Sequence, residues 1–213
     1  MNHVPFIAVE GPIGVGKSSL AEKISQHFHF HLLKEIVGEN PFLSKFYEDM
    51  DEWSFQTEMF FLCNRIKQLE DIQKNCLQKG IPVVSDYHMF KNLIFAKRTL
   101  DRDHLDKYIR IFHILNENLP RPNMVIYLHA NLDTLFSRIA KRGREYEKHI
   151  QESYLKHLCD DYEMYMDKFE RENPDLPVLR INGDDLDFVE NRKDLEKVLN
   201  QVENMLYKGA DKQ

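Results

Sequence analysis

The chain has 213 residues and a mass of 25.4 kDa, and its 42% hydrophobic and 30% charged residues are typical of a soluble globular protein. A net charge of −6 argues against a broad basic surface for nucleic-acid polymers. Cys63, Cys76 and Cys159 form no CxxC pair, which fits a reducing compartment without disulfides. The chain has no run of 18 or more apolar residues, which a membrane-spanning helix would need, and we expect no secretory leader at residues 1–6.

Short apolar runs alternate with longer amphipathic stretches along the chain, which is the pattern of an α/β fold. In chain order, strands are predicted at residues 6–9, 32–37, 81–86, 124–128 and 178–181. Helices are predicted at residues 15–28, 53–78, 90–98, 104–118, 132–142, 151–172 and 192–206. No linker divides these elements, so residues 1–208 are expected to form one domain, a three-layer α/β/α fold with a five-stranded parallel sheet, before a frayed tail at 209–213.

The first predicted strand leads into residues 11–18, which match the phosphate-binding pattern G-x-x-x-x-G-K-[ST] at every fixed position. Glycines let backbone N–H groups surround phosphate oxygens, Lys17 can contact the β- and γ-phosphates, and the Ser18 hydroxyl can bind Mg²⁺. An amphipathic helix follows, as such a P-loop requires. The residues predicted to bind ATP here are Gly11, Pro12, Ile13, Gly14, Val15, Gly16, Lys17, Ser18 and Ser19.

The P-loop alone indicates triphosphate binding, and three further observations narrow the class of protein. The guanine motif N-K-x-D of GTPases has no match, since the nearest string, at residues 191–194, has the wrong order. A chain of 213 residues leaves little room for the additional modules of a motor or transporter ATPase. The basic cluster from Arg138 to Arg144 suits a lid that closes over a phosphoryl group during transfer. Together these features favour a small-molecule kinase.

Four features besides the P-loop resemble the deoxyribonucleoside kinases, and the resemblance covers nearly the whole chain. They are Glu35-Ile36-Val37, Trp53-Ser54-Phe55, Asp86 at the end of a strand, and Arg138-x3-Arg142-Gly143-Arg144-x2-Glu147. Local strings such as Asn40-Pro41-Phe42-Leu43 and Asp86-Tyr87-His88 are most similar to bacterial deoxyguanosine kinases of Gram-positive type. Thymidylate kinases share a P-loop and an arginine lid but would carry Asp-Arg-[Tyr/Phe] at residues 86–88.

The resemblance implies a catalytic carboxylate at Glu35, which would orient the 5′-hydroxyl of a nucleoside and accept its proton. It also implies that Asp86 lies at the substrate and holds Mg²⁺ together with the P-loop serine. The family has an arginine near the 5′-hydroxyl where this chain has Tyr87, and Arg144 or Arg65 is expected to supply that charge instead. The structural alternatives are a surface acid after the second strand and a helix cap after the third.

By the same resemblance, Arg138 stacks on the ATP base, while Arg142 and Arg144 are catalytic and hold the transferring phosphoryl group. Glu147 and Tyr47 are expected to bind the substrate 3′-hydroxyl, which leaves little room for a ribose hydroxyl at C2′. The lid is expected at about residues 138–150. The alternative is a solvated basic stretch at a helix end.

In the family, a glutamine on the long helix pairs with the base, and here Glu58 occupies that place. An amide offers one donor and one acceptor, as adenine requires, whereas a carboxylate offers only acceptors. Guanine presents two adjacent donors, so Glu58 predicts deoxyguanosine as the preferred nucleoside, with solvent exposure of Glu58 as the alternative. Arg65 and Asn92 are expected to shape the same pocket. Three aromatic residues could enclose the base or simply belong to the core: Phe55, Phe90 and Phe95.

The expected function is therefore ATP- and Mg²⁺-dependent phosphorylation of a purine deoxyribonucleoside, deoxyguanosine to dGMP, in cytoplasmic nucleotide salvage. The alternatives are a deoxyadenosine/deoxycytidine kinase, a nucleoside monophosphate kinase and a non-catalytic nucleotide-sensing module. The resemblance implies a homodimer formed through the long helices, and neither a nucleic-acid polymer nor a membrane is expected as a partner. His27, His29 and His31 would form a metal-binding ladder only in a strand, and we expect them instead at a helix end and a strand start.

Overall fold

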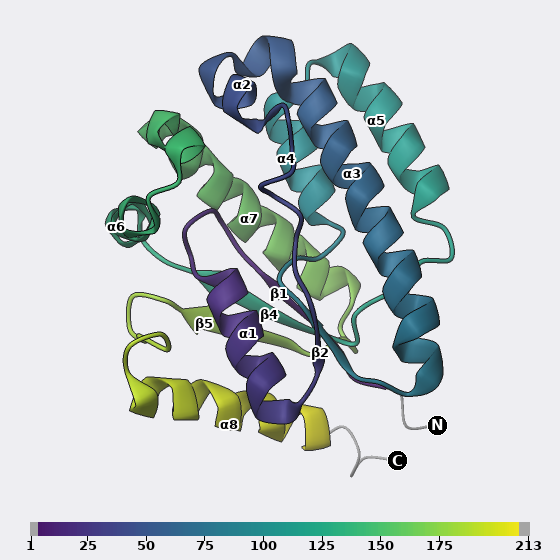
Figure 1. Ribbon diagram of the computed structural model, residues 1–213, viewed down its shortest axis with the longest axis vertical. Helices are drawn as coiled ribbons and strands as arrows, with labels where there is room; N and C mark the ends of the chain where they lie inside the picture. Colours follow the sequence, from purple (N-terminus) through teal and green to yellow (C-terminus); the bar gives the residue numbers. More distant parts are fainter. Residues whose placement is uncertain (1–3, 209–213) are drawn as a thin grey trace.

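The computed structural model describes residues 4–208, which form a parallel five-stranded sheet in the order β2-β3-β1-β4-β5 with helices packed against both faces (Figure 1). The strands are β1 (Phe6–Glu10), β2 (His31–Leu33), β3 (Val83–Ser85), β4 (Met124–His129) and β5 (Val178–Asn182). The helices are α1 (Lys17–Phe28), α2 (Leu43–Glu48), α3 (Met50–Asn75), α4 (Lys91–Thr99), α5 (Arg102–Leu115), α6 (Leu132–Arg142), α7 (Glu152–Glu172) and α8 (Arg192–Lys208), with short 3₁₀ helices η1 (Leu77–Lys79) and η2 (Glu145–His149). The predicted fold class is confirmed, and the predicted tail at 209–213 lies outside the described residues.

The strands β1 and β4 lie side by side at the centre of the sheet because their sequences are apolar over nearly their whole length. Every residue of β1 is buried, as are the first five residues of β4. Successive side chains of a strand point to opposite faces, so a strand covered on both faces needs an unbroken apolar run. In register, Ala8 lies opposite Ser85 on one side and Val125 on the other. The carboxyl ends of β1, β3 and β4 therefore meet at one edge of the sheet.

Two apolar clusters hold the helices on this sheet. The larger cluster contains Ile7 of β1 together with buried residues of α1, α7 and α8. The smaller cluster contains Phe6 of β1, Leu69 of α3 and Phe112 of α5. Because Phe6 and Ile7 are adjacent in one strand, their side chains point to opposite faces and each starts a different cluster. The long helix α3 and its neighbour α5 are thus fixed relative to the P-loop at the end of β1.

Two predicted boundaries near the P-loop are wrong for local reasons. The second strand, predicted at residues 32–37, ends at Leu33, because the backbone N–H of Glu35 donates to the Asp86 carboxylate at 2.6 Å instead of continuing the strand pairing. The first helix begins at Lys17 and not at residue 15, because Gly16 has a φ of +107° that ends the P-loop in a left-handed conformation.

The long helix also begins earlier than its pattern predicts, at Met50 instead of residue 53. Asp49 caps it, since the Asp49 carboxylate accepts from the backbone N–H of Glu52 at 3.2 Å. Two short elements, α2 and η2, were not predicted because segments of five or six residues carry too little periodicity. Both of them border the cavity described below.

The three spaced histidines take the positions expected for a helix end and a strand start. His27 lies in α1, His29 follows the helix with a φ of +58°, and His31 begins β2. All three are exposed, and they do not lie together in one strand, which a ladder would require.

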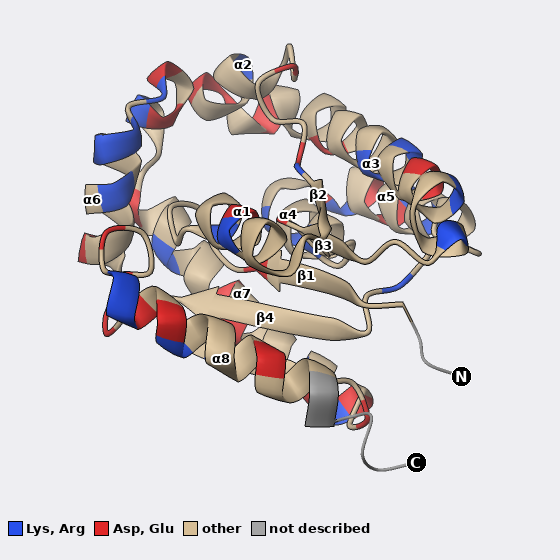
Figure 2. Ribbon diagram, turned by 60° about the horizontal axis from the view of Figure 1, so that its bottom comes forward, with Lys and Arg blue, Asp and Glu red and all other residues tan. Residues whose placement is uncertain are grey.

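Charge is distributed unevenly over the helices (Figure 2). Lys and Arg form a band on α6, which carries Arg138, Lys141 and Arg142. The strands carry few charges. Within residues 4–208, no helix is both long and apolar enough to cross a bilayer.

Candidate active site

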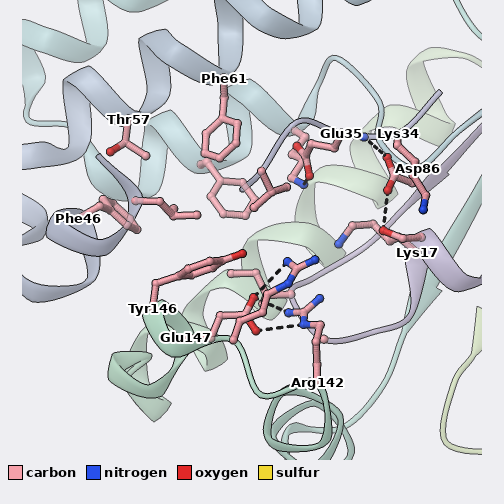
Figure 3. Close-up of a pocket in the computed structure, with 18 of the residues that line it drawn as sticks. Lys17, Lys34, Glu35, Phe46, Thr57, Phe61, Asp86, Arg142, Tyr146 and Glu147 are labelled. Atoms are coloured by element: carbon pink, nitrogen blue, oxygen red, sulfur yellow. Dashed lines mark hydrogen bonds and ion pairs between the residues drawn. The ribbon is translucent and has the colours of Figure 1, made fainter. Parts of the chain in front are cut away.

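A cavity of about 280 Å³ opens at the carboxyl edge of the sheet, between the P-loop, α2, α3, α4 and the lid segment of α6 and η2 (Figure 3). Most predicted site residues line it: Ile13, Gly14, Gly16, Lys17, Ser18, Ser19, Glu35, Tyr47, Glu58, Arg65, Asp86, Arg142, Arg144 and Glu147. The predicted residues outside its lining are Gly11, Pro12, Val15, Arg138 and Asn92. Ligands of open α/β sheets bind at this edge, so the topology itself favours this cavity as the site.

The P-loop glycines have conformations that a side chain would prevent. Gly11 and Gly14 have φ values of +149° and +86°. A Cβ atom on Gly11 would lie 2.1 Å from the carbonyl oxygen of Leu128, and one on Gly14 would lie 2.8 Å from that of Leu135. The loop therefore packs directly against β4 and α6, with the N-terminus of α1 at its end, where backbone N–H groups attract anions.

Lys17 lies folded over the P-loop. Its Nζ donates to the carbonyl oxygens of Gly11 at 2.7 Å and Pro12 at 2.9 Å. Burial and the nearby charge of Lys91 together lower the pKa of Lys17 to about 8, against the opposing charges of Glu10, Glu35 and Asp86. A half-buried ammonium group that donates to carbonyl oxygens can exchange them for the oxygens of an anion, which it attracts more strongly.

Asp86 joins the P-loop to the segment that follows β2. It comes directly after β3 and is only 4% exposed. Its Oδ2 accepts from the Ser18 hydroxyl at 2.5 Å, and its Oδ1 accepts from the backbone N–H of Glu35 at 2.6 Å. Asp86 thereby positions the predicted metal-binding serine and the predicted catalytic carboxylate with one side chain.

Glu35 is held by two cations, one on each carboxylate oxygen. Arg65 donates two N–H groups to Oε1, from Nε at 3.0 Å and from Nη2, and Lys91 donates to Oε2 at 2.7 Å. Burial alone would raise the pKa of Glu35, but the charges and hydrogen bonds of Lys91 and Arg65 outweigh it and hold the pKa far below its ordinary value. Glu35 is therefore a carboxylate at neutral pH.

Arg65 connects the Glu35 carboxylate to the core of the helical layer. Its Nη1 donates to the Asn92 side-chain oxygen, which also accepts from the Tyr108 hydroxyl at 3.2 Å. The guanidinium group lies over the Phe61 ring, 4.9 Å from its centre. Asn92 thus shapes the site through Arg65, without lining the cavity itself.

Glu58 lies on α3, two helical turns before Arg65, and is only 2% exposed. No hydrogen bond from residues 4–208 reaches its carboxylate, although it lines the cavity. Burial raises the pKa of Glu58 to about 8, against the opposing charges of Arg65 and Lys91. Because this carboxylate lines the cavity, its oxygens can accept hydrogen bonds from a ligand bound there.

The lid places three predicted residues together. Arg142 donates to both oxygens of Glu147, at 3.0 and 2.5 Å, and Arg144 lies 3.5 Å from the same carboxylate (Figure 3). Glu147 is buried, whereas both arginine side chains are more than a third exposed. Tyr146 stacks parallel to Tyr47 at 6.3 Å between ring centres. A single acid on η2 therefore gathers the arginines above the cavity.

Arg138 lies beside the P-loop, outside the cavity lining. Its guanidinium group donates to the carbonyl oxygens of Val15 at 2.9 Å and Gly183 at 2.8 Å. It therefore ties α6 to the P-loop and to the turn after β5. Of the three aromatic residues predicted either around the base or in the core, Phe95 lines the cavity, while Phe55 stacks on His104 and Phe90 on His88.

Several site residues were missed from the sequence: Lys91, Phe61, Tyr146 and Glu10. Glu10 is fully buried, and it accepts from the backbone N–H groups of Gly11 and His88 and from the Tyr162 hydroxyl. An acid that ends an otherwise apolar strand immediately before a P-loop was a usable signal. Lys91 offered none, because a lysine at the start of a helix is usually solvated.

The chain matches the family described as "Deoxynucleoside kinase" over residues 7–207. It is 52% identical over 206 residues to the deoxyguanosine kinase of Bacillus subtilis, covering 97% of this chain and 100% of that one. It is 30% identical over 222 residues to the deoxyadenosine/deoxycytidine kinase of the same organism, covering 99% of each. The structure of deoxyadenosine kinase from M. mycoides with bound dATP superposes with a TM-score of 0.79 at 26% identity, covering 93% and 99% of the two chains.

Proposed function

Because the chain belongs to the deoxynucleoside kinase family, we propose that it transfers the γ-phosphate of ATP to the 5′-hydroxyl of a deoxyribonucleoside and prefers deoxyguanosine. The observation that carries this proposal is the arrangement within one cavity. A P-loop lies on one side, a carboxylate held by two cations faces it, and a second carboxylate, Glu58, lines the cavity from α3. The 52% identity to a deoxyguanosine kinase supports the same substrate.

The donor triphosphate would lie on the P-loop, with Lys17 leaving its carbonyl partners to contact the β- and γ-phosphates. Ser18 and Asp86 would hold a Mg²⁺ ion, because a hydroxyl and a carboxylate are hard oxygen ligands and these two side chains meet in a hydrogen bond of 2.5 Å. When bound, Mg²⁺ neutralises phosphate charge.

Glu35 would accept the proton of the acceptor alcohol. As the bond from O5′ to the γ-phosphorus forms, the bond from that phosphorus to the bridging oxygen breaks, and its electron pair remains on ADP. The O5′ proton passes to the Glu35 carboxylate and then to solvent. Asp86 holds the backbone of Glu35, and Arg65 holds its Oε1, so the carboxylate has a fixed orientation toward the donor.

The lid would bind the anionic and sugar ends of the reactants. Arg142 and Arg144 project above the cavity and would contact the phosphoryl group in transfer. Glu147 and Tyr47 would bind the 3′-hydroxyl, with Glu147 exchanging part of its ion pairs for that contact. Arg138, held between the P-loop and the turn at Gly183, would flank the ATP base.

Glu58 would select guanine. Its free carboxylate can accept from guanine N1–H and N2–H₂ at once, a pairing for which adenine lacks the two adjacent donors. Glu58 is only 2% exposed, and a hydrogen bond is stronger in such a low-dielectric environment than in water. We also propose that the reaction belongs to cytoplasmic nucleotide salvage, which the free cysteines of the chain support.

The test is ADP release with ATP, Mg²⁺ and each of the four deoxynucleosides. We expect the highest kcat/KM with deoxyguanosine. In Glu58→Gln, whose amide supplies one donor and one acceptor, the ratio of kcat/KM for deoxyguanosine to that for deoxyadenosine should fall by roughly 10- to 100-fold. Gln56→Glu is the matched control, because residue 56 is exposed on the same helix.

An unchanged ratio in Glu58→Gln would discard guanine selection by Glu58 while leaving the kinase activity in place. Phosphorylation of dGMP in preference to every nucleoside would instead favour a monophosphate kinase. Binding of ATP with no transfer to any acceptor would favour a nucleotide sensor.

A further inference from the structure

Tyr87 stands where the resembling family carries an arginine, and it points away from the cavity. It is 1% exposed, and its hydroxyl donates to the Gln68 side chain at 3.2 Å. Of the two arginines expected to replace that charge, Arg65 is held on Oε1 of Glu35, and Arg144 approaches from the lid, beside Glu147. A further cation lies on the acceptor side of the site, next to Glu35.

The position of Lys91 beside Glu35 makes it this cation. It begins α4, four residues after Tyr87, and is 7% exposed. Its Nζ lies 2.7 Å from Oε2 of Glu35 and lines the same cavity as the P-loop. Among the described residues, 4–208, the Lys91 ammonium donates one hydrogen bond, to Glu35. Two of its three N–H groups are therefore available to a ligand.

The two cations on Glu35 differ in how firmly they are held. Arg65 contacts Oε1 through two N–H groups, donates to Asn92 and lies against Phe61, so its position is fixed from three sides. Lys91 makes one hydrogen bond, to Glu35, and its ammonium group lies over the Phe95 ring, 5.6 Å from the ring centre, so it is held by fewer polar contacts than Arg65. Oε2 is consequently the oxygen that can exchange its partner for an entering hydroxyl group.

Lys91 and Lys17 also face one cavity, with each charge felt by the other. Two like charges in a buried site repel each other unless an anion lies between them. The negative group that must pass from the P-loop to the acceptor hydroxyl is the transferring phosphoryl group.

We propose that Lys91 is a catalytic residue that holds Oε2 of Glu35 in the free enzyme and, when the acceptor alcohol enters, contacts the phosphoryl group in transfer. This inference rests on the proposed kinase function. The O5′ proton goes to Oε2 as the O5′–phosphorus bond forms and the bond to the bridging oxygen of ADP breaks. The ammonium group of Lys91 offsets the negative charge that builds on the phosphoryl oxygens.

The test compares Lys91→Met with Lys97→Met, an exposed lysine on the same helix. We expect kcat with deoxyguanosine to fall roughly 10²- to 10³-fold in Lys91→Met and to stay unchanged in Lys97→Met. The dissociation constant of ATP should change by no more than about threefold, since a contact made in the transition state affects kcat more than ground-state binding. Lys91→Arg should recover part of the lost rate.

Chemical rescue separates a chemical role of the ammonium group from a structural one. In Lys91→Ala, added methylammonium should raise kcat at least about tenfold in a saturable manner, whereas ethanol should not. Wild-type kcat in Lys91→Met, or rescue by ethanol as strong as by methylammonium, would overturn the inference. If the wild-type protein and Lys97→Met phosphorylated no nucleoside, the proposed function itself would fail, which is a distinguishable result.

Discussion

Two buried carboxylates in the cavity, Glu35 and Glu58, have pKa values shifted in opposite directions. Both are desolvated, but Lys91 and Arg65 contact Glu35 directly, whereas they act on Glu58 only at a distance. Glu35 therefore keeps its charge, while the pKa of Glu58 rises to about 8. Environments that separate the pKa values of two acids assign them different roles, here a charged acceptor of a proton and a titratable contact to the base.

The raised pKa of Glu58 predicts a pH dependence of base selection. Below about pH 8 the free protein holds a proton on Glu58, and guanine binding to the carboxylate must release it. The ratio of kcat/KM for deoxyguanosine to that for deoxyadenosine should therefore rise with pH, by up to about tenfold per unit between pH 6 and 8, and level off above. Using the ratio cancels the titration of Lys17, which binds the donor in both reactions.

Glu58→Gln should abolish this slope, because the amide does not titrate. The charged groups that act on Glu58 are Arg65 on its own helix, Lys91 on α4 and Glu35 after β2, and all three remain in the variant. A ratio that stays flat with pH in the wild-type protein would contradict the prediction. The raised pKa also affects stability. Between pH 4.5 and about 8, Glu58 holds a proton in the folded protein but not in the unfolded chain, so the free energy of unfolding falls as the pH rises through this range.

At the scale of elements, the P-loop depends on its contact with β4. Gly11 follows β1 directly, and its missing side chain lets the loop approach the backbone of Leu128. The ends of β1 and β4 are neighbours in the parallel sheet, and the P-loop lies between them. A shift of the loop away from β4 would therefore displace the phosphate-binding site and disturb the packing of the sheet.

Gly11→Ala should lower the free energy of unfolding by roughly 1–3 kcal/mol and weaken ATP binding, because both its φ of +149° and the 2.1 Å approach to Leu128 exclude a Cβ atom. Urea unfolding and ATP titration measure the two effects. Gly38→Ala is the matched control, since a Cβ atom there would meet nothing within 4 Å. Equal stability of the two variants would show that the loop adapts.

At the scale of the whole molecule, α3 and α5 pack side by side and leave an outer face (Figure 1). Ile114 and Leu115 at the end of α5 are exposed, at 68% and 39%. Apolar side chains gathered next to a long helix support the expected pairing of two copies through this face.

Sedimentation equilibrium should therefore give twice the 25.4 kDa mass of the chain. Ile114→Glu should shift the population toward monomer, because it buries a charge in the pairing face. Met164→Glu should leave the dimer intact, since Met164 is equally exposed at 68% but lies on α7. A wild-type protein that sediments as a monomer would refute the dimer.

How far the sequence could predict the site depends on how local each signal is. The P-loop occupies eight consecutive residues between a strand and a helix, so its pattern and context can be read together. Asp86 was also within reach, because parallel strands place their carboxyl ends at one edge. The roles assigned to Glu35, Glu58 and the lid arginines came from family resemblance and stay predictions until tested.

Sequence patterns were sufficient to predict the α/β class, the order of the main elements and the phosphate-binding loop, because apolar periodicity and glycine spacing act over short stretches of chain. The folded chain was needed to reveal that Lys91 contacts Glu35 across 56 residues and that Arg65 contacts the same carboxylate across 30. Those pairs exist because α3 and α4 pack together over the carboxyl edge of the sheet. Contacts of this kind leave no local pattern, since their geometry follows from how whole helices pack.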